Sequence, residues 1–184
     1  MHSNGEAKQE ENFQIKKGKS WVDSLSIGLR VSSFVASITA ACIGFTSSQS
    51  SIVFGIQMEA KYSFSSAFKF FAYATAIASV SSALSLGFTF FLRRRSTVSS
   101  KANHHWFFFM HDLVMMLLVL SGSVAATSIG YVGKYGNDHA GWMPICDHFH
   151  IFCRKVAAAV VLGYFSFLSS FLLTIISAIE YRSS

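Results

Sequence analysis

Four long stretches with almost no charge constrain this 184-residue chain more than any other feature. They cover about 25–52, 70–92, 106–132 and 156–179, and the second and fourth contain no charged residue. A helix needs about 20 mainly apolar residues to cross roughly 30 Å of hydrocarbon. Uncharged helices of this length have no polar face to show water, which excludes the core helices of a soluble protein. We therefore predict an all-α integral membrane protein, a bundle of four transmembrane helices.

The remaining segments are short, so one membrane domain over 25–180 is expected between two tails, 1–24 and 181–184. Charged residues make up only 13% of the chain, against about a quarter in soluble domains. The first tail is polar and rich in Lys, and it lacks the apolar core of a secretory signal. We expect no cleavable signal peptide.

Lys and Arg residues outside the spans are divided unequally between the two sides of the membrane. One side has nine: Lys8, Lys16, Lys17, Lys19, Arg93, Arg94, Arg95, Lys101 and Arg182. The other side has five: Lys61, Lys69, Lys134, Arg154 and Lys155. The richer side of a membrane protein faces the cytosol, so we predict cytosolic N- and C-termini. The net charge of +6 is then explained by topology and by attraction to anionic lipid, and no nucleic-acid partner is expected.

Small residues recur every four positions within two of the spans. The stripes are Gly122, Ala126 and Gly130 in the third span, and Ala74, Ala78 and Ser82 with Ser79, Ala83 and Gly87 in the second. Such stripes let helix backbones approach closely in a membrane. We predict that they pack helices together, mostly within one bundle, with contact between subunits as the alternative.

Arg30 and Asp112 are the two charges inside the predicted spans. Both lie one to two turns from the side of the termini, so their depths in the bilayer are similar. A charge left alone in hydrocarbon costs at least about 3 kcal/mol, and pairing removes much of that cost. We predict an intramembrane ion pair. The alternatives are that Arg30 snorkels to the headgroups or that both charges belong to an ion or proton path, while His111 is expected to point elsewhere.

The second outer loop, between the third and fourth spans, contains Cys146 and Cys153. Disulfides persist on the exoplasmic side, and a compact loop can bring two Cα atoms within the required 4.4–6.8 Å or so. We predict a disulfide between them. A zinc site that adds His148 and His150 is an alternative, although its spacing matches no common zinc finger, and two free thiols are another. Cys42, inside the first span, is expected to be a small packing residue.

These features together resemble the plant Casparian strip membrane domain protein-like (CASP-like) family. The stretches that carry the resemblance are Leu29–Val31, Tyr62–Phe68, His111–Leu113, Tyr135–Asn137 and the Trp-x-x-x-Cys…Phe-Cys segment Trp142–Cys153. The resemblance covers roughly residues 20–180 and implies kinship with MARVEL-type four-span proteins. The family's paired Arg and Asp would be Arg30 and Asp112, and its loop cysteines Cys146 and Cys153.

The resemblance also implies a function. It implies a non-enzymatic plasma-membrane scaffold that forms homo- and hetero-oligomers with related four-span proteins and organises a membrane domain. The Casparian strip proteins proper recruit cell-wall lignifying enzymes, so cell-wall-modifying partners belong to this expectation. Those proteins carry a longer acidic-aromatic motif in the first outer loop, which residues 46–69 lack. The likeness is therefore to a general CASP-like scaffold.

The residues leave two other classes of function open. A channel or transporter needs several polar groups facing a lumen, often from broken helices, whereas the polar groups at mid-membrane are mostly Ser and Thr. An enzyme needs converging acids, bases or metal ligands, and only the His-rich second outer loop comes near this. We predict no catalytic residue, metal or cofactor, and a small channel or transporter-like protein is the alternative function.

Overall fold

A computed structural model of the chain describes residues 3–53, 56–95 and 101–183. Its helices are α1 (Ser3–Thr46), α2 (Ser66–Arg95), α3 (Lys101–Tyr135) and α4 (His150–Ser183). Each helix contains a segment that is long and apolar enough to cross a membrane: Ser24–Thr46, Ser66–Phe91, Phe109–Tyr135 and His150–Ile179. The prediction of a four-span membrane protein is confirmed.

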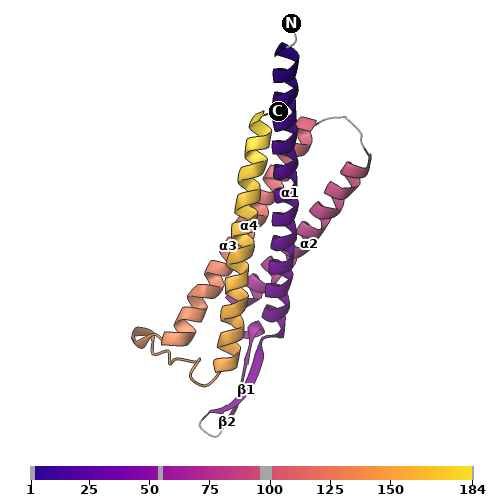
Figure 1. The fold of residues 1–184 in the computed structure, drawn as a ribbon. Helices are drawn as coiled ribbons and strands as arrows, with labels where there is room; N and C mark the ends of the chain where they lie inside the picture. Colours follow the sequence, from indigo (N-terminus) through magenta and orange to yellow (C-terminus); the bar gives the residue numbers. More distant parts are fainter. Residues whose placement is uncertain (1–2, 54–55, 96–100, 184) are drawn as a thin grey trace.

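The helices form an up-and-down bundle in which each helix packs on the next and α4 closes against α1. Figure 1 shows both termini at one end of the bundle and the two connections α1–α2 and α3–α4 at the other. We call this second end the outer end. Residues 3–23 continue α1 beyond its membrane segment, and part of the predicted 93–101 loop, residues 96–100, lies outside the described residues.

The first span is shorter than predicted, because α1 ends at Thr46 and not near residue 52. Ser47 ends the helix by bonding back to it, through its amide to the Gly44 carbonyl (3.3 Å) and through its hydroxyl to the Ile43 carbonyl (2.6 Å). Residues Ser48–Val53 (β1) then pair antiparallel with Ile56–Lys61 (β2). This hairpin satisfies backbone groups through the strand ladder, which allows Ile52 to sit outside the bundle with 76% of its surface exposed.

Small side chains and hydroxyls fill the centre of the bundle, and large apolar side chains cover its outside. Ala40 and Ala126 are completely buried, while Val80, Leu84 and Phe90 on α2 are each more than 60% exposed. This distribution suits a protein whose surroundings are as apolar as its own side chains, because helix association then depends on close packing. Cys42 differs from its expected packing role, since it lies exposed on the outside of the bundle.

The small-residue stripes lie partly inside the bundle. Ala74, Ala78 and Ala126 are buried, and a Cβ at Gly122 would lie 3.2 Å from Cβ of Ala74. Gly130 does not pack within this chain, contrary to expectation, because nothing lies within 4 Å of where its Cβ would be. Ala83 and Gly87 also face outward, beyond the buried part of their stripe.

Gly163 on α4 is required by the closest approach of the helices. A Cβ at this position would lie 2.6 Å from Oγ of Ser123 on α3 and 2.9 Å from a ring carbon of Phe71 on α2. Ser123 is completely buried, and its hydroxyl is the one buried side-chain polar atom without a hydrogen-bond partner among the described residues. The missing side chain at Gly163 therefore lets three helices meet.

We predict that Gly163→Ala lowers the thermal stability of the purified protein by about 1–3 kcal/mol, the usual cost of overpacking a core. Adding Ser123→Ala should recover part of this loss, because it removes the nearest clashing atom and leaves no partner unpaired. Gly28→Ala is the matched control, since no atom lies within 4 Å of its Cβ position. Equal effects at Gly163 and Gly28, measured by detergent thermal unfolding, would contradict this packing role.

Candidate functional site

Arg30 on α1 and Asp112 on α3 meet inside the bundle as a two-pronged ion pair. The guanidinium Nη1 lies 3.1 Å from Oδ1 and Nη2 lies 2.8 Å from Oδ2 of the carboxylate. The two side chains are only 10% and 6% exposed. The guanidinium thus bonds the carboxylate inside the bundle, which differs from the snorkelling alternative, in which Arg30 would extend to the headgroups.

The ion pair joins helices that otherwise hardly touch. α1 and α3 stand on opposite corners of the bundle, because each packs closely on α2 and α4. Arg is long enough to cross this diagonal, and its planar fork matches a carboxylate in two bonds at once. The pair therefore fixes the depth of α1 relative to that of α3.

Ser85 and His111 also contact the pair, and Ser85 was missed in the sequence. Ser85 on α2 accepts a hydrogen bond from Nη1 of Arg30, which brings a third helix into the site. His111 places Nδ1 3.4 Å from Oδ1 of Asp112, although it was expected to point elsewhere on the helix. Ser85 carries no signal of its own in a Ser-rich span, and only its depth, close to that of Arg30, could have indicated it.

A serine seam, defined as Ser33, Ser37, Ser166 and Ser170, joins α1 to α4. The Ser33 hydroxyl lies 3.2 Å from that of Ser166 and 3.0 Å from that of Ser170, and Ser37 lies 3.0 Å from Ser166. Ser37 also donates to the backbone carbonyl of Ser33. All four are buried. Each hydroxyl thus has a partner in a region where lipid offers none, and the seam pairs polar groups of α1 with those of α4.

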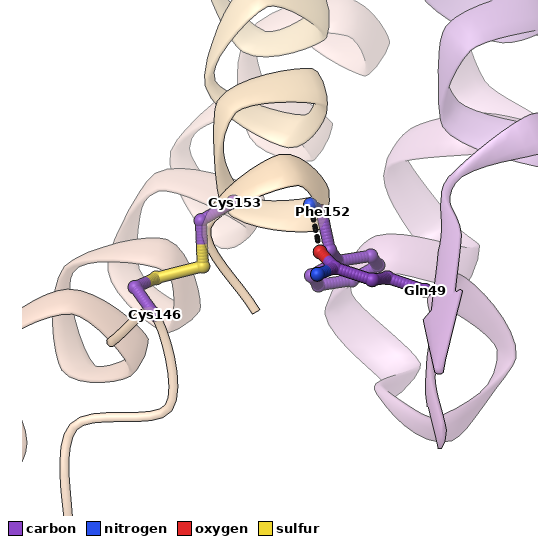
Figure 2. The surroundings of a disulfide bond; sticks show 4 residues. All are labelled: Gln49, Cys146, Phe152 and Cys153. Atoms are coloured by element: carbon purple, nitrogen blue, oxygen red, sulfur yellow. Dashed lines mark hydrogen bonds between the residues drawn. A yellow bond between two sulfur atoms is a disulfide. The ribbon is translucent and has the colours of Figure 1, made fainter. Parts of the chain in front are cut away.

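The outer loop, residues 136–149, is joined to the start of α4 by a disulfide between Cys146 and Cys153 (Figure 2). The two Cα atoms are 5.7 Å apart, and the predicted disulfide is present. Closing so short a loop stabilises by about 2.5 kcal/mol in the chain-entropy model. The zinc alternative is contradicted, because the bonded sulfurs are no longer thiolate ligands.

The loop is also anchored to the end of α3. The Gly133 carbonyl accepts hydrogen bonds from the amides of Ile145 (2.8 Å) and Cys146 (3.1 Å). Gly136 turns the chain out of α3 with φ of 73°, and a Cβ there would come within 2.7 Å of the Trp142 carbonyl oxygen. Only glycine suits both the left-handed conformation and this close approach.

Gln49 on β1 connects the hairpin to α4. Its side-chain oxygen accepts a hydrogen bond of 2.8 Å from the amide of Phe152, in the first turn of α4 (Figure 2). The first four amides of a helix have no partner within the helix, so this contact acts as a cap supplied by a distant segment. Nothing in the sequence singles out Gln49, since its partner lies 103 residues away.

Comparison with known proteins places the ion pair and the disulfide-stapled outer loop in the domain of one family. A family model described as the Casparian strip membrane protein domain matches residues 19–169. This chain belongs to the CASP-like family. CASP-like protein 1F1 of Vitis vinifera is 47% identical over 96% of this chain and 84% of its own length. CASP-like protein 1F1 of Arabidopsis thaliana is 38% identical over 84% of this chain and 89% of its own length.

A relative whose name has a different letter is also similar. CASP-like protein 1C1 of Sorghum bicolor is 40% identical over 72% of this chain and 75% of its own length. No solved structure matches the chain. The matched region contains Arg30, Ser85, Asp112 and both bonded cysteines, so the ion pair and the stapled outer loop lie within the CASP-like domain.

The ion pair predicts energetic coupling between its two members. Arg30→Leu and Asp112→Leu should each lower the thermal stability of this CASP-like protein, because each leaves one charge buried without its counter-charge. The double substitution should recover much of the loss, and a double-mutant cycle should give a coupling energy of about 1–3 kcal/mol. The exchange Arg30→Asp with Asp112→Arg should recover less, since the side chains differ in length.

Two controls sharpen this cycle. Lys69→Leu removes a cation from an exposed position of α2 and should change stability little. Ser85→Ala should lower stability less than Arg30→Leu or Asp112→Leu, because the ion pair between Arg30 and Asp112 remains intact. If the stability loss of the double variant equals the sum of the two single losses within about 0.5 kcal/mol, Arg30 and Asp112 are not energetically coupled.

Proposed function

We propose that this CASP-like chain is a non-enzymatic plasma-membrane scaffold that oligomerises and organises a membrane domain. The observation that carries the proposal is that the polar groups inside the membrane segments bond to one another. The Arg30–Asp112 pair with Ser85, and the serine seam, bond helix to helix within the bundle. Such contacts favour a rigid body that presents surfaces over a conduit with polar groups facing a lumen.

Two outward surfaces support the scaffold function. Ala83 and Gly87 on α2 continue a buried small-residue stripe onto the outside of the bundle, where a second helix could approach closely. At the outer end the hairpin exposes Ile52, Ile56 and Met58 away from the helices. We assign contact with other four-span chains to the α2 surface and recruitment of cell-wall-modifying partners to the hairpin.

The scaffold proposal includes cytosolic termini and an outer end that faces the cell exterior. The excess of Lys and Arg on the side of the termini supports this orientation. The disulfide at the opposite end also supports it, since disulfides persist in oxidising surroundings.

One labelling experiment tests orientation and disulfide together. In a Cys42→Ala background, the remaining cysteines are Cys146 and Cys153. We expect an impermeant thiol reagent to label neither in intact cells, and to label both after an impermeant reductant. Labelling without reduction would mean free thiols. Labelling that requires permeabilised cells would show that the orientation is the opposite of the one proposed.

Mass photometry of the purified full chain in small lipid nanodiscs, and of detergent samples after dilution, tests oligomerisation. We expect assemblies larger than one chain that Ala83→Leu converts toward monomer, because the larger side chain separates the two α2 surfaces. Ala158→Leu is the matched control, as it adds the same bulk at an exposed position of α4. A monomer under all conditions, or single-channel currents from the reconstituted protein, would contradict the scaffold.

A further inference from the structure

A cavity of about 780 Å³ lies between α3 and α4 at the outer end, beneath the outer loop. This size falls within the range of about 300–1,000 Å³ that is typical of ligand sites. Figure 1 shows α3 diverging from α4 toward this end. The lining includes Ala126, Gly130, Val160 and Tyr164 from the helices and Ile145 from the loop. We call this cavity the outer groove.

The outer groove exists because small residues stand where α3 faces α4. Nothing lies within 4 Å of a Cβ placed at Gly130. The hydroxyl of Tyr164 is bonded to that of Thr127 at 3.0 Å, so these polar atoms have already found a partner. The remaining surface is mainly aliphatic and aromatic, which suits an apolar occupant.

One end of the groove differs from the rest. Lys134 lines it at the last turn of α3, with Nζ 5.1 Å from the centre of the Tyr135 ring. Tyr131, Tyr135 and Trp142 surround this end and are each about 60% exposed, as aromatic residues at a membrane–water interface are. A site that is apolar along its length and cationic at its outer end matches an amphiphile with a negative group at its head.

The length of the groove identifies which amphiphile fits. Its α3 wall runs from Ala126 to Tyr135, which is about 14 Å at 1.5 Å per residue. This is close to half of the roughly 30 Å hydrocarbon thickness, the depth that a lipid tail of one leaflet occupies. A transmembrane helix of a second chain would need the full thickness, and the loop residues Met143, Ile145 and Cys146 line the outer end of the groove.

We propose that the outer groove binds one acyl chain of a phospholipid from the leaflet at the outer end, with its phosphate beside Lys134. The lipid fills space that the chain leaves between α3 and α4 and lies against the loop held by Cys146 and Cys153. The assignment to the external leaflet rests on the orientation proposed above. The groove itself lies within one chain and does not depend on oligomerisation.

Photo-crosslinking of the full chain in nanodiscs tests this site, with phosphatidylcholine that carries a diazirine near the middle of one acyl chain. We expect adducts concentrated on peptides that contain 126–135 and 156–164. Gly130→Leu should lower these adducts about tenfold, the effect of about 1.4 kcal/mol on binding. Gly28→Leu is the matched control, because it places the same side chain at an exposed glycine of α1 with open space around it.

Further arms identify the ligand. Diacylglycerol with the same diazirine chain lacks the phosphate and should label the groove less, and Lys134→Gln should remove that difference. Val160→Phe fills the groove from α4. It replaces Gly130→Leu as the groove-filling variant if the Gly130→Leu protein lacks the Cys146–Cys153 disulfide. Adducts spread evenly over the lipid-facing helices would overturn the proposal. So would stronger groove labelling by a photoreactive sterol, or crosslinks from the groove to a second chain.

Discussion

The Arg30–Asp112 ion pair is the contact that most restricts how these helices can be arranged. Replacing a buried pair with packed apolar residues is often neutral, but separating its two members is costly. Sliding α1 by one turn against α3 would move the guanidinium about 5 Å from the carboxylate and leave both charges in hydrocarbon. The relative depth of the two helices is therefore fixed, and Ser85 extends that restriction to α2.

Packing around the pair follows from the lack of hydrophobic drive within lipid. Helices gain by approaching closely, and they do so through alanine, serine and the missing side chain of Gly163. Hydroxyls bond across α1 and α4, where an unpaired one would be costly. Large apolar side chains cover the outside, because lipid accommodates them at no cost. The bundle is tight at its centre and opens where α3 leaves α4 near Gly130.

Sequence reasoning predicted the features that depend on one-dimensional spacing. The four spans follow from run length, and the facing of Arg30 and Asp112 follows from their equal depth. The Cys146–Cys153 bond follows from proximity in sequence. Features set by three-dimensional neighbours were missed. The hairpin was read partly as span because residues 48–52 prolong an uncharged run, and Gly163 could not be told from other glycines without Phe71 and Ser123 beside it. Gly130 was assigned to packing because a stripe does not reveal where two helices diverge.

The single hydrogen bond from Phe152 to Gln49 has a consequence for the surface at the outer end. Phe152 is next to Cys153, so the hairpin and the disulfide-stapled loop are both attached to the first turn of α4, although more than 70 residues separate them in the chain. A synthetic peptide copied from either segment lacks the other one. An antibody raised against the whole protein at this end would recognise a shape that neither peptide reproduces, and substitutions at Gln49 would alter its binding from beneath the contact surface.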